Sequence, residues 1–246
     1  MHRFFVPADQ IDEKRVVVRG SDVNHIRKVL RLSEGDHILV VDGEGRQWQV
    51  RLTGLGAKEV EGEVVTEVSV ATESPVKIVM GQALIKGNRF DHLVRKAVEL
   101  GVHQVLPLES GRCVARIKKQ EVEKKLERWQ RIAEEAAKQC GRSKIPQVGP
   151  NIPDLKSFCD QVETCDLKLL FWEDETRARL RDVDNGDKAI GSIAFVAGPE
   201  GGWEPQEVEF LKKCGFLTVG LGPRTLRADS ASLVILSLLQ QRWGDL

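Results

Sequence analysis

Apolar and polar side chains alternate in four short runs within residues 1–70, and a period of two is typical of β-strands with one buried face. The runs are residues 16–19, 37–41, 47–53 and 60–70. The turn Asp42-Gly43-Glu44-Gly45 joins the second run to the third and indicates a β-hairpin. Residues 25–32 are expected to form a short amphipathic helix. The pattern therefore predicts a small β-barrel or β-sandwich.

The pattern changes after residues 71–75, a polar stretch that ends at Pro75 and is expected to be a linker. Strands are then predicted at residues 76–85, 102–108, 167–172, 193–197 and 216–221, and helices at 89–100, 120–140, 204–214 and 229–243. Such alternation is typical of a mostly parallel sheet with helices on both faces. We therefore expect two domains, residues 1–72 and residues 76–246, of which the second has an α/β fold.

The charges of the chain balance, since lysine and arginine together number 37 and so do aspartate and glutamate. An overall basic charge, the simplest sign of a nucleic-acid partner, is therefore missing. Basic side chains nevertheless cluster in residues 112–119, which contain four of them and no acidic residue. A local cluster of this kind can bind phosphate on a protein of zero net charge.

The sequence predicts neither a membrane span nor a metal site. Its apolar stretches fall well short of the roughly 20 residues that cross a bilayer, and the first residues do not resemble a secretory signal. The five cysteines are scattered, and the nearest pair, Cys159 and Cys165, has no histidine beside it. Free buried thiols are expected, in place of a zinc site or a redox pair. A cytoplasmic location follows as the expectation.

Three loops follow predicted strands of the α/β domain, where open α/β sheets bind their ligands. They are Phe171-Trp172-Glu173-Asp174, Gly198-Pro199-Glu200-Gly201-Gly202 and residues 220–230. Glycines in the second and third loops allow the backbone to approach a ligand closely, although strand–helix turns are often rich in glycine for structural reasons alone. Neither loop has the G-x-G-x-x-G pattern of dinucleotide sites or the lysine of a P-loop. A dinucleotide or a nucleoside triphosphate is therefore not favoured.

Several longer motifs carry a resemblance to a known family. GPEGG at residues 198–202 is followed by LGPRTLRADSA at 221–231, and upstream lie MHRFF at the start, HIRKVLRL at 25–32, IKGNRFDHLVRKAVELGV at 85–102 and RWQRIAEEAAKQCGRSKIPQV at 128–148. In this order, and over nearly the whole chain, the sequence resembles the RsmE family of SPOUT-class RNA methyltransferases. The family usually has Arg-Thr-Glu-Thr-Ala where this chain has Arg227-Ala228-Asp229-Ser230-Ala231.

The resemblance implies an architecture and a cofactor. It implies a PUA-like N-terminal β-barrel domain and a C-terminal α/β domain with a deep trefoil knot, at which a homodimer binds S-adenosylmethionine. The residues expected to bind the cofactor are Phe171, Trp172, Glu173, Ala197, Gly198, Pro199, Gly201, Gly202, Leu221, Gly222, Arg224, Leu226 and Arg227.

The implied reaction is methylation of N3 of a uridine in 16S ribosomal RNA of the small ribosomal subunit. The site must remove the N3 proton or stabilise the uracil anion. Arg224 and Arg227 are expected to stabilise the anion, and Glu200 or Asp229 to accept the proton, so the catalytic candidates are Arg224, Glu200 and Asp229. Two alternatives stay open, namely a structural role for Glu200 and a helix cap or loop brace at Asp229.

Six basic residues are expected to contact RNA: Arg3, Arg27, Arg31, Lys86, Arg112 and Arg142. Contacts with phosphate give position and affinity, and any single one of these residues is also compatible with a solvated surface charge. Two other functions stay open. One is a SPOUT methyltransferase that acts on transfer RNA or on a ribose 2′-hydroxyl, and the other is a non-catalytic RNA-binding factor in ribosome assembly.

Overall fold

A computed structural model describes residues 1–69, 72–184, 186 and 188–246. The chain divides into two compact units. The first contains Met1–Glu73 and Ala137–Ile145, and the second contains Ser74–Ala136 and Pro146–Leu246. The first unit thus includes a later segment that the expected division at residues 71–75 does not assign to it.

The first unit is a five-stranded sheet in the order β1-β3-β4-β5-β2. Its strands are β1 (Arg3–Phe5), β2 (Arg15–Arg19), β3 (His37–Val41), β4 (Gln47–Leu55) and β5 (Glu59–Glu67). The predicted hairpin between β3 and β4 is confirmed, and Asp42 closes its turn by accepting hydrogen bonds from the amides of Glu44, Gly45 and Arg46. Alternate residues of β2, such as Val16 and Val18, are buried in one apolar core, as the period of two predicts.

The helix predicted at residues 25–32 is only partly right. An α-helical turn, α1 (Ser21–Asn24), begins earlier, and a π-helical turn, His25–Val29, continues it. Arg31 then adopts a left-handed backbone with φ of 55°, which ends the helix before Leu32. Ile26 is fully buried in the core of the sheet, so the apolar face of this segment was predicted correctly.

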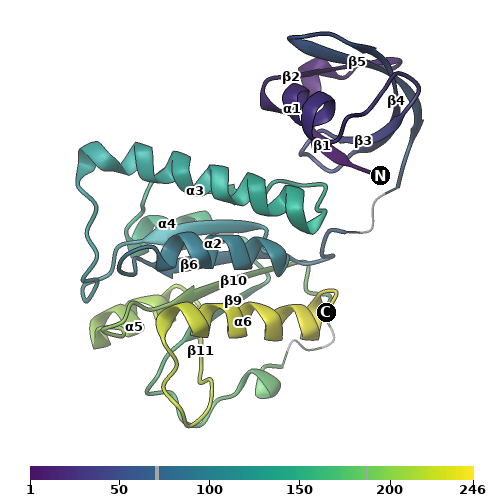
Figure 1. Cartoon of the computed structure of the whole chain (residues 1–246). Helices are drawn as coiled ribbons and strands as arrows, with labels where there is room; N and C mark the ends of the chain where they lie inside the picture. Colours follow the sequence, from purple (N-terminus) through teal and green to yellow (C-terminus); the bar gives the residue numbers. More distant parts are fainter. Residues whose placement is uncertain (70–71, 185, 187) are drawn as a thin grey trace. The chain divides into compact units, whose positions relative to one another are not determined.

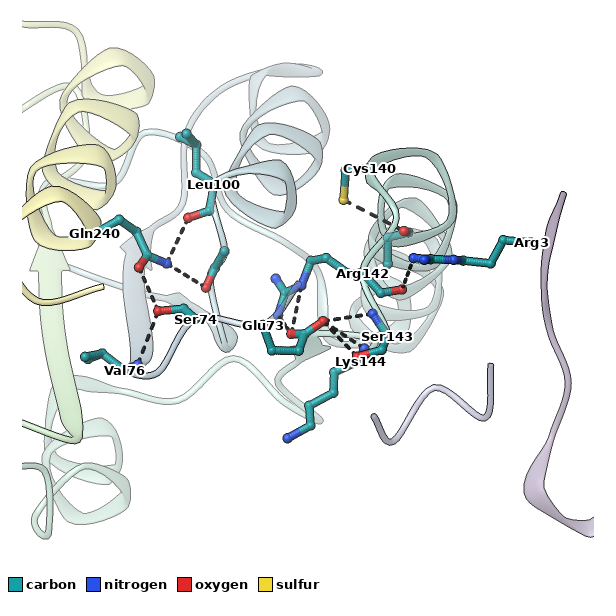
Figure 2. Close-up of polar contacts among 12 residues, drawn as sticks. Arg3, Glu73, Ser74, Val76, Leu100, Cys140, Arg142, Ser143, Lys144 and Gln240 are labelled. Atoms are coloured by element: carbon teal, nitrogen blue, oxygen red, sulfur yellow. Dashed lines mark hydrogen bonds and ion pairs between the residues drawn. The ribbon is translucent and has the colours of Figure 1, made fainter. Parts of the chain in front are cut away.

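An ion pair joins the segment Ala137–Ile145 to the rest of the first unit (Figure 2). The Arg142 guanidinium lies 2.7 Å from the Glu73 carboxylate, and the two side chains are only 7% and 17% exposed. The other Glu73 oxygen accepts hydrogen bonds from the amides of Ser143 and Lys144 at 2.8 and 3.1 Å. Arg3 in turn donates to the main-chain carbonyl of Arg142. These long-range contacts place the segment in the first unit.

The second unit is built on a six-stranded sheet in the order β11-β9-β10-β6-β7-β8, and every strand pair in it is parallel. Figure 1 labels four of these strands, β6, β10, β9 and β11, in this order across the sheet. The strands are β6 (Lys77–Ala83), β7 (Gln104–Leu108), β8 (Gln147–Val148), β9 (Leu167–Phe171), β10 (Ser192–Ala197) and β11 (Leu217–Val219). The predicted parallel sheet is confirmed, with the short strand β8 as an addition.

The four helices predicted after residue 75 are confirmed to within one residue at either end. They are α2 (Arg89–Glu99), α3 (Lys119–Cys140), α5 (Pro205–Lys213) and α6 (Ala228–Trp243). The structure also contains a short helix that the sequence does not predict, α4 (Leu155–Gln161). In the part of the chain that the structure describes, none of the helices is long and apolar enough to cross a membrane.

Helices cover both faces of the sheet, as two neighbouring residues of β6 show. A Cβ atom at Gly81 would lie 2.7 Å from the Phe158 ring of α4, whereas Gln82 accepts a hydrogen bond from Ser232 of α6. Adjacent strand residues point to opposite faces, so α4 and α6 lie on opposite sides. Helix α5 packs beside α4, and α2 packs beside α6. Gln240 of α6 joins that second pair by donating to the carbonyls of Leu100 and Gly101 (Figure 2).

The end of β11 and the residue after it contact the segment that follows β9. The amide of Gly220 donates to the carbonyl of Ala178 at 3.0 Å, and Thr218 donates to Glu175 at 3.0 Å. From α6, Arg242 donates to the carbonyls of Leu180 and Val183. Residues 218–220 therefore lie against residues 175–179, and Arg242 of α6 contacts the residues that follow.

Candidate active site

A cavity of about 580 Å³ opens at the carboxyl ends of β9, β10 and β11. Its walls are the three loops that follow these strands, together with Arg89 at the start of α2 and Ala228, Ala231 and Ile235 of α6. This is the position at which parallel α/β sheets bind ligands, and the volume lies within the range of small-molecule sites.

All of the residues expected to bind the cofactor line this one cavity. From the first loop come Phe171, Trp172 and Glu173, from the second Ala197, Gly198, Pro199, Gly201 and Gly202, and from the third Leu221, Gly222, Arg224, Leu226 and Arg227. The structure thus brings together three loops that are far apart in the sequence. Their direct contact with a cofactor stays a prediction.

Trp203 holds two of the loops together. Its indole N–H donates to the main-chain carbonyl of Phe171 at 3.2 Å, and the side chain is only 2% exposed. Gly198 lies against the indole, because a Cβ atom there would be 3.1 Å from Nε1. Gly202 has φ of +71°, and a Cβ atom at this position would collide with the Glu173 carboxylate. Glycine is therefore needed in this loop for backbone shape and for close packing.

The loop 198–202 is also braced from its other side. The Glu200 carboxylate accepts a hydrogen bond from the Lys86 amide at 3.0 Å, and the Arg89 guanidinium lies 3.6 Å from the same oxygen. Arg112 donates to the carbonyl of Gly201 at 3.3 Å. Two residues that were expected to contact RNA, Lys86 and Arg112, thus lie beside the cavity wall, and both side chains are exposed.

The three catalytic candidates lie in different places. Arg224 and Glu200 line the cavity, but Asp229 does not. Helix α6 begins at Ala228, so Asp229 lies in its first turn and accepts a hydrogen bond from the amide of Ser230 at 3.0 Å. A carboxylate there complements the positive end of the helix dipole. The geometry therefore favours the structural alternative for Asp229.

The remaining residues expected to contact RNA lie in the first unit. Arg27 is half-buried and Arg31 is exposed, which suits a contact with phosphate. Arg142, in contrast, is only 6% exposed and its guanidinium pairs with Glu73. Arg3 is half-buried beside it. An RNA contact at Arg142 is therefore disfavoured, because the buried pair already satisfies its charge.

Three residues that line the cavity lie outside the loops that the sequence indicates, namely Arg89, Ala231 and Ile235. Pro223, Thr225 and Ala228 lie in the indicated loop 220–230 but are not among the expected cofactor-binding residues. Arg89 follows the carboxyl end of β6, so the rule that pointed to the other three strand ends also applied there. Ala228 is the position at which this chain departs from the usual family sequence, and it forms part of the wall.

The cysteines are all free. Cys113 and Cys159 are buried as expected, whereas Cys140, Cys165 and Cys214 are only partly buried. Burial, reinforced by a hydrogen bond with Cys214, raises the pKa of Cys159 to about 12. Within the described ranges, no group of three or more His, Cys, Asp or Glu side chains is arranged to hold a metal ion.

Comparisons with known proteins agree with this geometry. The model of an RNA methyltransferase domain matches residues 72–240, and that of an RNA methyltransferase PUA domain matches residues 18–65. The chain is 30% identical to Ribosomal RNA small subunit methyltransferase E of Bacillus subtilis, over 97% of this chain and 96% of that protein. It is 33% identical to the protein of the same name from Synechocystis, over 96% of this chain and 76% of that protein.

Solved structures show the same fold over the full length. The structure of Ribosomal RNA small subunit methyltransferase E from Neisseria gonorrhoeae, bound to S-adenosyl methionine, has a TM-score of 0.88 and 34% sequence identity, and the match covers 100% of this chain and 99% of that one. A putative methyltransferase from Legionella pneumophila, in complex with the same cofactor, has a TM-score of 0.85 and 30% identity, over 99% and 98% of the two chains. The expected fold class, a SPOUT-type α/β domain with a PUA-like β domain, is confirmed, and the chain belongs to the RsmE family of RNA methyltransferases.

Proposed function

We propose that this protein uses S-adenosylmethionine to methylate N3 of a uridine in 16S ribosomal RNA. One observation carries the proposal: three loops from separate strand ends, which contain all of the residues expected to bind the cofactor, meet around one cavity of about 580 Å³. Two relatives of known structure, which match the chain over its full length, are bound to this cofactor.

The residues of the cavity fit such a ligand. Glycines at 198, 201, 202 and 222 expose main-chain groups to the cavity, which suits hydrogen bonds with the edge of an adenine ring. Leu221 and Leu226 offer apolar surface for the ring faces. When bound, S-adenosylmethionine supplies an electrophilic methyl group. The chain itself must then orient the uracil, exclude water and manage the N3 proton.

The charged residues of the cavity suit the management of that proton. Arg224 is exposed on the cavity wall and can stabilise negative charge on a uracil oxygen. Of the two carboxylates that were expected to accept the proton, Glu200 faces the cavity and Asp229 does not. Glu200 is therefore the proposed proton acceptor, and Asp229 stabilises the start of α6.

The proposed substrate is the small ribosomal subunit or its 16S RNA, and the proposed place of action is the cytoplasm. The PUA-type match at residues 18–65 supports RNA binding by the first unit, where Arg27 and Arg31 are available to phosphate. In the second unit, Lys86 and Arg112 are exposed beside the cavity. Phosphate contacts of this kind set the position of an RNA and make its binding dependent on salt.

The proposed active form is a homodimer. Helix α6 exposes Val234 and Leu238, which are four residues apart and therefore lie on the same face of the helix. Leu226, in the loop before α6, is also exposed. An apolar surface next to the cavity suits contact with a second copy of the chain. Sedimentation of the wild type and of Leu238→Glu tests this, since the charged side chain should shift the protein to the monomer.

Two experiments test the proposed activity. Calorimetric titration with S-adenosylmethionine separates an enzyme from a non-catalytic RNA-binding factor, and failure to bind would rule out the enzyme. Mass spectrometry of ribosomal RNA nucleosides from a strain without the gene then identifies the product. Loss of 3-methyluridine from 16S RNA is expected. Its persistence would move the substrate to another RNA.

A further inference from the structure

Arg89 and Glu200 form a charged pair on the wall of the cavity. The Arg89 Nη1 and Glu200 Oε1 atoms are 3.6 Å apart, and both residues line the cavity. Their side chains are 47% and 26% exposed, so a ligand can reach both. A half-exposed ion pair at this separation contributes little to stability. Its position on the cavity wall therefore points to a role in binding.

The pair is held in place by main-chain contacts. Lys86 donates its amide hydrogen to Glu200 Oε1 at 3.0 Å, which fixes the carboxylate from the loop after β6. Arg89 is the first residue of α2, so its backbone belongs to a helix of eleven residues. The donor and the acceptor thus come from two elements that are each ordered by their own hydrogen bonds. A pre-organised pair of this kind can select a ligand by its pattern of donors and acceptors.

Such a pair complements uracil. The Watson–Crick edge of uracil presents a carbonyl oxygen, O4, directly beside a donor, N3–H. A guanidinium that donates to O4 and a carboxylate that accepts from N3–H match this edge. Cytosine presents the reverse order, with an amino group at C4 and an acceptor at N3. Cytosine would therefore leave both charged groups facing atoms of the wrong kind, which costs binding energy.

We infer that Arg89 and Glu200 together bind the edge of the target uracil, and that Arg89 stabilises the anion formed when N3 loses its proton. The inference rests on the proposed methylation of uridine N3. In this step the N3–H bond breaks, the proton passes to a Glu200 carboxylate oxygen, and the electron pair stays on the ring, delocalised onto O4 beside the Arg89 guanidinium. Arg89 is thereby assigned to contact with the substrate, and Arg224 contributes charge from the loop after β11.

The test compares the wild type with Arg89→Met on two substrates. Small ribosomal subunits are assembled with either ordinary uridine or 5-fluorouridine, whose N3 proton is more acidic. On uridine we expect Arg89→Met to lose about 100-fold in kcat, a typical loss for one charge-stabilising donor. On 5-fluorouridine the variant should lose only about 10-fold in kcat, because the more acidic N3 forms its anion with less stabilisation from Arg89. The affinity for S-adenosylmethionine should stay within a factor of two.

Controls separate this inference from the proposed function and from a structural effect. Arg95→Met removes an exposed arginine from the same helix, outside the cavity, and should behave as the wild type on both substrates. Arg89→Lys should recover part of the lost rate, since it restores the charge. An equal loss on both substrates would overturn the inference, as would weaker cofactor binding by Arg89→Met. A wild type that produces no 3-methyluridine would instead overturn the proposed function.

Discussion

Trp203 donates its indole N–H to the main-chain carbonyl of Phe171, and this single hydrogen bond joins the end of β9 to the loop after β10. Both residues are buried, Trp203 to 2% exposure and Phe171 to 5%. The bond spans 3.2 Å, and the indole packs against Gly198 of that loop. The shape of the cavity wall therefore depends on a residue that does not itself line the cavity.

Replacement of Trp203 by Phe should weaken both the fold and the cofactor site. The Phe171 carbonyl would lose its partner, which costs about 1–3 kcal/mol when the group is buried. Urea unfolding should show this loss, and calorimetry should show weaker binding of S-adenosylmethionine. Trp243→Phe, at the end of α6, is the matched control. If the two variants bind the cofactor equally well, the loop does not depend on this hydrogen bond.

Gly202→Ala should weaken cofactor binding for a different reason. The added methyl would collide with Glu173, and φ of +71° is strained for any other residue. Gly35→Ala is the control for strain alone, because Gly35 also has positive φ but has open space around it. Both variants should lose about 1 kcal/mol of stability. Only Gly202→Ala should lose affinity for S-adenosylmethionine in a calorimetric titration, and normal affinity would contradict the packing argument.

The sequence predicts this fold best where local pattern determines structure. The sequence pattern places α2 and α6 to within one residue at either end, and the strand-end rule finds three of the loops that form the cavity. Helix α4 was not predicted, because its seven residues are too few to show a period. Its start at Asp154, which accepts a hydrogen bond from the Ser157 amide, is the signal that was present.

Long-range contacts explain what the sequence does not predict. The segment Ala137–Ile145 belongs to the first unit because Arg142 pairs with Glu73, and no local pattern links residues so far apart. Arg142 lies in a segment that resembles the family, so a contact with RNA is expected from the sequence. Its burial beside Glu73 is visible only in the structure. The ion pair of Arg89 and Glu200 likewise depends on two segments that the fold brings together, and no local pattern in the sequence predicts it.

Glu73→Gln should lower the free energy of unfolding at neutral pH and make it less dependent on pH in the acid range. Burial alone would raise the pKa of Glu73, but the hydrogen bond and charge of Arg142, with the amides of Lys144 and Ser143, outweigh it and hold the pKa below its ordinary 4.5. Because the pKa of Glu73 is lower in the folded state, its ionised carboxylate stabilises the fold above pH 4.5. This contribution is lost as the pH falls through the pKa of the folded state. The variant should lose about 2 kcal/mol at pH 7, because a buried guanidinium loses its counter-charge.

The measurement is urea unfolding of both proteins between pH 7 and pH 3. The difference in unfolding free energy between wild type and Glu73→Gln should be constant above pH 5 and shrink below pH 4.5. Glu67→Gln is the control, since Glu67 pairs with Arg46 on the exposed surface of the same unit. A difference that does not change with pH would mean that the charge of Glu73 is not what holds the segment in place.

Arg224→Ala should keep the fold and the oligomeric state but lose most of the turnover. The side chain is exposed on the cavity wall, so its removal leaves neither a cavity in the core nor a buried charge without a partner. Loss of a group that stabilises charge in the reaction lowers kcat by about 100- to 1,000-fold. Thermal unfolding and sedimentation should match the wild type, and so should all properties of Arg181→Ala, whose side chain lies in the short 3-10 helix Leu180–Asp182 and is 85% exposed. Initial rates of methyl transfer to small ribosomal subunits measure the effect, and a wild-type rate for Arg224→Ala would remove Arg224 from the catalytic residues.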